Sequence, residues 1–285
     1  MTFSEHFYDS ACGRLRLFAR DYRGDGPPLL LMHGLTRNSS DFEPLAAHLA
    51  GDYRLIVPDQ RGRGRSENDP DPANYTPENY ARDMFALLES LQIQRPAVIG
   101  TSMGGLIAMT MNAMQPGLFP AVVFNDIGPE IAPEGLARIA SYVGGGEPLS
   151  SWEEAAKACA GINGSAFPDF AEADWQAWAK RTCRGLPDGR VEFAYDPAIA
   201  KAFENTNESD KTDLWPLWEM LGETPVLVLR GALSDLLTPD TVAAMKQRHD
   251  GPFRSIEIAN RGHAPLLDEP DAVGAIKLFL QEYLV

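Results

Sequence analysis

Residues 97–105 read AVIGTSMGG, an apolar run that leads into a glycine-rich turn around one serine. Residues 100–104 match the pattern G-x-S-x-G, in which the small residues let the chain turn sharply from a strand into a helix. The pattern predicts a strand before the turn and an apolar helix over 103–114 after it. Ser102 would then lie at a helix N-terminus, where the helix dipole favours negative charge, and it is our candidate nucleophile.

Further apolar runs on both sides of this stretch indicate a parallel sheet. Short runs without polar interruptions are typical of strands buried on both faces, and here they alternate with helical patterns. The predicted strands are 15–22, 28–32, 54–57, 97–99, 121–124, 226–229 and 254–258. One predicted helix begins at Thr76, an N-cap residue followed by a proline and an early acid. The chain therefore has the pattern of an α/β fold in which a mostly parallel sheet is flanked by helices.

The strand pattern stops in the middle of the chain. Residues 129–221 contain all five tryptophans and show helical stretches instead, at 134–143, 151–160, 171–183, 197–204 and 213–221. The alternation of strands and helices resumes from residue 222. We therefore expect an α/β core over 1–128 and 222–285, interrupted by a helical insertion over 129–221.

Length, composition and charge narrow the classes of function. A chain of 285 residues that is 44% hydrophobic can bury one large core. The formal net charge of −15 would repel phosphate backbones and anionic lipid, so neither nucleic acid nor a membrane surface is an expected partner. The expected substrate is a small molecule that is neutral or cationic. A homodimer is compatible with these features.

The cysteines and the N-terminal residues bear on metal binding and location. The three cysteines are far apart and show no CxxC spacing, so we expect neither a disulfide framework nor a metal site. The N-terminal residues lack the basic and apolar regions of a signal peptide, and no apolar run approaches the ~20 residues of a membrane span. A cytoplasmic protein is the resulting expectation.

A nucleophilic serine at neutral pH needs a base, a group that orients the base, and donors for an oxyanion. His263 is the best candidate base among five histidines. It lies in a loop after the predicted strand 254–258, at the sheet edge where Ser102 is expected. The other histidines lie at the N-terminus, in helical stretches or beside a glycine that the oxyanion site requires.

Two aspartates could orient His263. Asp235 follows a predicted strand, and the chain order Ser102, Asp235, His263 is the order expected for a triad in this kind of fold. Asp126 follows the predicted strand 121–124 and would also lie near the site. We prefer Asp235 and keep Asp126 as the alternative, whose other role would be to support the entrance to the insertion.

Two backbone N–H groups are the expected oxyanion donors. The pair His33-Gly34 ends the predicted strand 28–32, and the glycine lets the backbone come close to the site. The N–H groups of Leu35 and Met103 would hold the oxyanion. His33 is expected to form structural hydrogen bonds rather than to act as a base.

Together these motifs resemble the α/β-hydrolase superfamily. They are HG at 33–34, DQRGRGRS at 59–66, GTSMGG at 100–105, Asp235, and GH at 262–263. The resemblance spans nearly the whole chain and is closest to bacterial serine hydrolases with a helical cap. It implies a Ser-His-Asp triad, no cofactor, and a cap over 129–221. Many relatives have histidine where Arg63 stands, and we expect the arginines of this turn to pair with nearby acids.

The resemblance also implies a substrate pocket and a reaction. Gly34 and the tryptophans Trp152, Trp175 and Trp178 would line an apolar pocket for an acyl or alcohol group. The expected reaction is hydrolysis of a carboxylic ester through an acyl-enzyme, as in carboxylesterases. The main alternative is an enol-lactonase or a carbon–carbon bond hydrolase of the same fold, and the further ones are a perhydrolase and a non-enzymatic binding protein.

Two departures from related patterns favour the ester reaction. Ala264 follows the candidate base, where hydrolases that cleave carbon–carbon bonds in ring-fission products typically carry tryptophan. The candidate nucleophile is Ser102 rather than an aspartate, which argues against the usual haloalkane dehalogenases and epoxide hydrolases.

Overall fold

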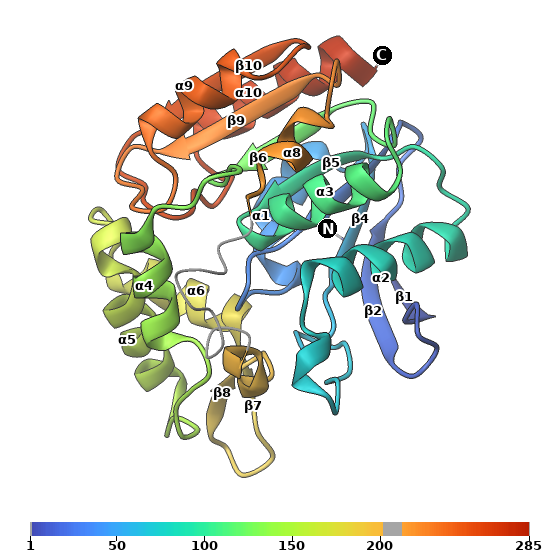
Figure 1. Ribbon diagram of the computed structural model, residues 1–285. Coiled ribbons are helices and arrows are strands. Elements are labelled where there is room, and N and C mark those ends of the chain that lie inside the picture. The colour runs from blue at the N-terminus through green and yellow to red at the C-terminus, as the bar shows by residue number, and fades with distance from the viewer. Residues whose placement is uncertain (1, 202–212, 285) are drawn as a thin grey trace.

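One eight-stranded sheet organises the protein (Figure 1). The computed structural model describes residues 2–201 and 213–284. The strand order is β1-β2-β4-β3-β5-β6-β9-β10, and neighbouring strands are parallel except in the two pairs that involve β2. The strands are β1 (Ser4–Asp9), β2 (Arg16–Tyr22), β3 (Pro28–Met32), β4 (Arg54–Asp59), β5 (Ala97–Thr101), β6 (Val122–Asn125), β9 (Val226–Gly231) and β10 (Phe253–Ile258). The predicted mostly parallel α/β sheet is confirmed.

Helices cover both faces of this sheet. One face carries α2 (Pro77–Ser90), α3 (Met103–Met114), α8 (Trp215–Glu219) and α9 (Pro239–Gln247), and the other carries α1 (Glu43–Leu49) and α10 (Pro270–Leu284). Successive side chains of β3 alternate between the two cores, with Leu30 and Met32 on the α3 side and Leu29 and Leu31 on the α10 side. Because both faces are buried, the strand reads as one continuous apolar run.

The chain between β6 and β9 forms a separate group of elements beyond the carboxyl ends of the parallel strands. Figure 1 shows α4, α5, α6, β7 and β8 gathered there, on one side of the sheet. Their bounds are α4 (Pro133–Tyr142), α5 (Trp152–Asn163), α6 (Glu172–Thr182), β7 (Cys183–Gly185) and β8 (Val191–Phe193). A small core of their own holds α5, α6, β7 and β8 together, with Phe167, Trp175 and Trp178 buried in it, whereas Ile139 of α4 packs against the core on the α3 side of the sheet.

The antiparallel pair β7–β8 differs from the purely helical prediction for this part of the chain. Residues 187–189 make the connecting turn, and Gly189 has a φ of +88°, a conformation that favours glycine. Each strand has only three residues, too few for an alternating pattern to be visible in the sequence. Within the predicted helix 197–204, residues 197–200 form a 3₁₀ helix, while 202–204 lie outside the described residues. The 3₁₀ helices are η1 (Ser39–Phe42), η2 (Pro72–Asn74), η3 (Gly164–Ala166) and η4 (Pro197–Ala200).

Glycines allow α3 to approach the sheet closely. A Cβ atom on Gly104 would lie 2.1 Å from the carbonyl oxygen of Met32, and one on Gly100 would lie 2.6 Å from the backbone of Gly104. Both distances are far below any van der Waals contact, so a side chain at either position would push α3 away from β3 and β5. The close approach fixes the turn that carries Ser102.

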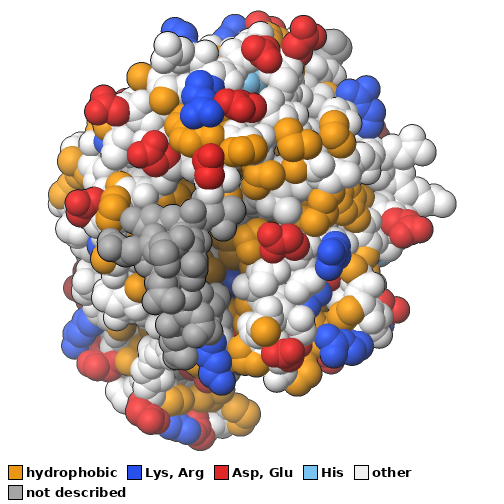
Figure 2. Space-filling model, viewed as in Figure 1, with side chains coloured by type: hydrophobic (Ala, Val, Ile, Leu, Met, Phe, Trp, Pro, Cys, Tyr) orange, Lys and Arg blue, Asp and Glu red, His pale blue; other side chains and the backbone are white. Residues whose placement is uncertain are grey.

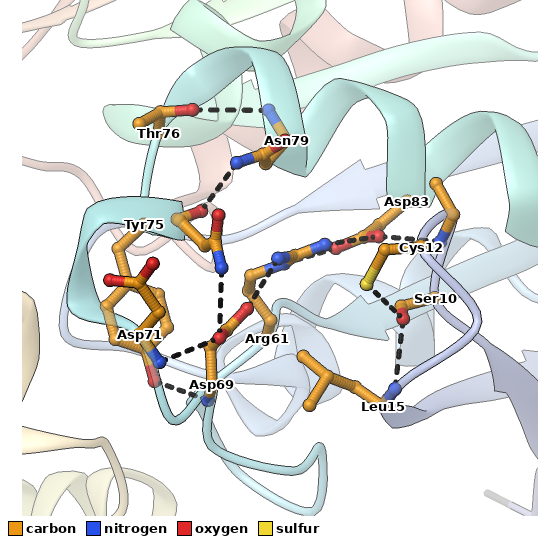
Figure 3. Close-up of polar contacts among 12 residues, drawn as sticks. Ser10, Cys12, Leu15, Arg61, Asp69, Asp71, Tyr75, Thr76, Asn79 and Asp83 are labelled. Carbon is orange, nitrogen blue, oxygen red and sulfur yellow. Dashed lines mark hydrogen bonds and ion pairs between the residues drawn. The ribbon is translucent and has the colours of Figure 1, made fainter.

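A buried arginine stabilises the loop that follows β4 (Figure 3). The guanidinium of Arg61 donates to Asp83 at 2.7 Å and to Asp69 at 2.8 Å, and all three side chains are almost fully buried. Arg65 pairs with Glu5 at the surface. These two arginines confirm the predicted pairing with nearby acids, and the loop is thereby held against α2.

Charged side chains of both signs are distributed over the surface (Figure 2). On the face shown in Figure 2, acidic and basic side chains are interspersed, and no large patch of one sign is visible. None of the helices in residues 2–201 and 213–284 combines the length and apolar character that a bilayer crossing would need.

Candidate active site

Ser102 lies in the turn between β5 and α3, as predicted. Its φ of +51° and ψ of −118° are strained for a residue with a side chain. The backbone is held there by a hydrogen bond of 3.0 Å from the Ser102 N–H to the carbonyl oxygen of Asn125. This strained turn between a strand and a helix matches the nucleophile turn that the G-x-S-x-G pattern predicts.

His263 and an aspartate complete a hydrogen-bonded chain behind the serine. The Nε2 atom of His263 lies 2.8 Å from Ser102 Oγ, and its Nδ1 atom lies 2.8 Å from an oxygen of Asp126. An Nδ1–H that donates to the carboxylate leaves Nε2 free to accept the serine proton. The three side chains therefore have the geometry of a nucleophile, a base and a group that orients the base.

Asp126 is fully buried and held in place by further donors. Gly231 N–H donates to one carboxylate oxygen at 2.8 Å, and the Ser234 hydroxyl donates to the other at 2.6 Å. Both donors come from β9 and the loop after it, next to β6 in the sheet. The carboxylate that faces His263 is thus fixed by the element that also carries Asp235.

The preference for Asp235 as the orienting acid is corrected by this geometry. Asp235 forms a bidentate ion pair with Arg138 of α4, at 2.5 and 2.9 Å, and the guanidinium holds the pKa of that carboxyl below its usual range. Asp126, the alternative weighed from the sequence, occupies the position against His263. Because β6 and β9 are neighbouring parallel strands, both aspartates emerge at the same sheet edge, and chain order alone does not distinguish them.

The loop after β3 is shaped to present an N–H group to the site. His33 Nδ1 lies 2.7 Å from the Gly34 carbonyl oxygen, and His33 Nε2 accepts the Gln60 N–H at 3.1 Å. In a trans peptide the carbonyl and the following N–H point in opposite directions, so this hydrogen bond turns the Leu35 N–H away from His33. Burial lowers the pKa of His33 to about 4, which keeps the ring neutral, and its two hydrogen bonds to backbone groups agree with the structural role expected of it.

Met103 would provide the second predicted oxyanion donor. It is the first residue of α3, and the first N–H groups of a helix have no acceptor within the helix. A Cβ atom on Gly34 would lie 3.7 Å from Ser102 Cβ, so the loop after β3 reaches the nucleophile. The backbone at 34–35 and at 103 therefore lies next to the serine, where an oxyanion hole is expected.

Arg63 differs from its two neighbouring arginines. It is buried, and within the described residues it forms no ion pair. Its Nε donates to the Leu35 carbonyl at 2.9 Å, and its Nη2 lies 3.5 Å from Met103 Sδ. The ring of Tyr80 lies 4.8 Å from its guanidinium carbon. Arg63 thus contacts both residues expected to hold the oxyanion. The sequence analysis expected it to pair with a nearby acid instead.

Ser102 and His263 line a small cavity of about 90 Å³ between the sheet edge and the insertion. Of the predicted pocket residues, Gly34 and Trp178 line it. Trp175 packs in the core of the insertion and Trp152 stacks under Lys180, so neither belongs to this lining. Lining residues that the sequence did not single out are Arg37, Asp41, Ile139, Tyr142, Asn163, Thr182, Phe193 and Tyr195. No group of histidines, cysteines or acids in the described ranges could hold a metal ion.

The fold and this site define a hydrolase of the α/β type. The chain belongs to the Alpha/beta hydrolase family, whose model matches residues 29–276. A solved structure of an alpha/beta hydrolase from Novosphingobium aromaticivorans has a TM-score of 0.91, with 42% identity over 98% of both chains. The predicted fold class is thereby confirmed at the level of the family.

Two curated relatives carry more specific names. A 3-hydroxybutyrate-oligomer hydrolase of Cupriavidus necator is 33% identical over 95% of this chain and 94% of its own length. A 2-(acetamidomethylene)succinate hydrolase of Mesorhizobium japonicum is 30% identical over 84% of this chain and 83% of its own length. Both relatives are hydrolases, and the two names describe different substrates.

Proposed function

We propose that this α/β hydrolase cleaves carboxylic esters, with Ser102 as nucleophile, His263 as base and Asp126 as the acid that orients the base. The observation that carries the proposal is the chain of two 2.8 Å hydrogen bonds from Ser102 through His263 to Asp126. A non-enzymatic binding protein would have no use for a base aligned on a strained serine.

The reaction would proceed by acyl transfer. Ser102 Oγ attacks the ester carbonyl while its proton moves to His263 Nε2, and Asp126 stabilises the imidazolium that forms. The N–H groups of Leu35 and Met103 stabilise the oxyanion of the tetrahedral intermediate. His263 then protonates the leaving alcohol, and a water molecule hydrolyses the acyl-enzyme by the reverse sequence.

Esters are preferred over the alternatives for two reasons. The relative matched over 95% of this chain is named for oligomers of 3-hydroxybutyrate, and hydroxy acids are joined to one another by ester bonds. The carbon–carbon hydrolase alternative lacks support at Ala264, the position after the base. We further propose that 129–221 acts as a cap domain that encloses the substrate.

Activity on p-nitrophenyl esters of increasing acyl length tests the proposal. We expect the wild type to hydrolyse at least the short esters, and Ser102→Ala to lose about 10³-fold or more of kcat. A vinylogous diketone serves as the competing substrate for carbon–carbon cleavage. Turnover of the diketone alone, or ester hydrolysis that Ser102→Ala leaves unchanged, would refute the ester proposal.

A further inference from the structure

Arg37 lies in the cavity wall next to the nucleophile. It follows the loop that carries the Leu35 N–H, and its Cγ atom and Ser102 Cβ lie 3.6 and 3.7 Å from the position of a Cβ atom on Gly34. Only 13% of its side chain is exposed. Arg37 and Ser102 therefore approach Gly34 from two sides and line the same cavity.

The guanidinium of Arg37 is held rigidly on one edge and open on the other. Asp41 accepts from Nε at 2.6 Å and from Nη2 at 2.5 Å, and the Trp178 ring centroid lies 4.1 Å from Cζ. Nη1 donates to none of the residues that the structure describes. A guanidinium offers five N–H groups in a planar fork, so the edge formed by Nη1 and Nη2 can still bind a carboxylate in a bidentate manner.

The adjacent wall of the cavity carries further donors without partners. Trp178 Nε1 and Thr182 Oγ1 are buried, and neither has a hydrogen-bond partner among the described residues. Both residues line the cavity, and their spacing of four residues on α6 places them on one face of that helix. Leaving a buried donor unpaired is unfavourable, and an oxygen-rich ligand at this wall would relieve it.

We infer that this wall, formed by Arg37, Trp178 and Thr182, binds a free carboxylate of the substrate. The inference rests on the proposed function and narrows its substrate class to esters that carry a carboxylate, such as short oligoesters of hydroxy acids. The net charge of −15 argued for a neutral or cationic substrate. Hydrogen-bond donors at the site outweigh distant charges, however, because exposed charges beyond about 8 Å are screened at physiological ionic strength.

Asp41 neutralises Arg37, so recognition depends on directed hydrogen bonds more than on net attraction. The ion pair and the Trp178 ring fix the plane of the guanidinium before a ligand arrives, which lowers the entropic cost of binding. A bidentate pair also fixes the orientation of the ligand, because both carboxylate oxygens are engaged. The ester carbonyl would then be presented to Ser102 in a defined direction.

Binding to a catalytically inactive protein tests the inference independently of turnover. Isothermal titration of Ser102→Ala compares monomethyl glutarate, which carries one carboxylate, with the neutral dimethyl glutarate. We expect adding Arg37→Met to weaken monomethyl glutarate binding by about tenfold or more and dimethyl glutarate binding by less than about threefold. Arg37→Lys, which keeps the charge but loses the fork, should fall between.

The two ligands separate recognition from folding. Equal losses for both ligands would assign Arg37 a purely structural role, and an unchanged affinity for monomethyl glutarate would overturn the inference. A triple variant that adds Asp41→Asn removes the carboxylate left without a partner and should reproduce the selective loss. If the wild type hydrolysed none of the p-nitrophenyl esters, the proposed function would fail, while the binding measurements would still show whether Arg37 recognises a carboxylate.

Discussion

His33 and His263 differ in the groups that bind their ring nitrogens. His33 is fully buried, both of its ring nitrogens bind backbone groups, and its pKa is lowered to about 4. His263 instead bridges a serine hydroxyl and a carboxylate. The same type of side chain thus fixes the loop after β3 in one place and lies between a serine hydroxyl and a carboxylate in the other.

The environment of His33 predicts a pH-dependent stability. Its folded pKa of about 4 lies below the value of 6.5 of an unperturbed histidine, so between these values the unfolded chain binds more protons and stability falls as pH falls. From pH 7 to pH 5 we expect a loss of about 2 kcal/mol from this residue. Urea unfolding at both pH values should show a smaller pH dependence in His33→Asn, and an identical dependence would contradict the assignment.

Arg63 is predicted to act on the reaction through the loop after β3, which carries the proposed oxyanion donor Leu35 N–H. Arg63→Met leaves the Leu35 carbonyl without its donor and should lower kcat by about tenfold or more, with a change in KM below about threefold. Arg65→Met is the matched control, because Arg65 lies in the same loop but pairs with Glu5 at the surface. Equal effects of the two substitutions, or a loss confined to KM, would exclude this positioning role.

The residues of the site differ in how well the sequence predicts them. Ser102 and His263 could be predicted because each stands in a local motif after a strand. The choice between Asp126 and Asp235 could not be predicted, because both follow neighbouring strands at the same sheet edge. It depends on which of the two carboxylates pairs with Arg138. Arg37 stood outside every motif, and its importance emerges only from its place in the cavity wall.

At the scale of elements, glycines allow α3 to lie close against the sheet. The predicted elements of the core appear because strands buried on both faces leave continuous apolar runs. The pair β7–β8 escaped prediction because it is short and partly exposed. Elements with many buried side chains leave a recognisable apolar pattern in the sequence and could be predicted. The short strands β7 and β8, which are joined by one turn, leave no such pattern and could not.

The close approach of α3 predicts that Gly104→Ala is strongly destabilising. The added methyl would lie 2.1 Å from the Met32 carbonyl oxygen, a backbone atom that cannot move aside. We expect a loss of at least about 2 kcal/mol in urea unfolding. Gly274→Ala in α10 is the control, because its Cβ meets nothing within 4 Å and should raise stability by up to about 1 kcal/mol. Similar effects at both positions would contradict the packing argument.

At the scale of the molecule, the insertion is tied to the core by several polar contacts around the cavity. Arg138 of α4 pairs with Asp235, and Asn38 donates to the Arg181 carbonyl at 2.8 Å. Gly262 N–H donates to the Ala166 carbonyl at 2.7 Å, next to His263. These contacts fix the insertion against the core, and they show that Asp235 belongs to the junction between the two.

The central claim is that Ser102, His263 and Asp126 act as one triad, and the rate of labelling by a fluorophosphonate tests it most directly. Mass spectrometry of the wild type should locate one adduct on Ser102. We predict that Asp126→Asn slows labelling by about 10³-fold or more, while Asp235→Asn stays within about tenfold of the wild type. An adduct on another residue, or a larger loss in Asp235→Asn than in Asp126→Asn, would contradict the account.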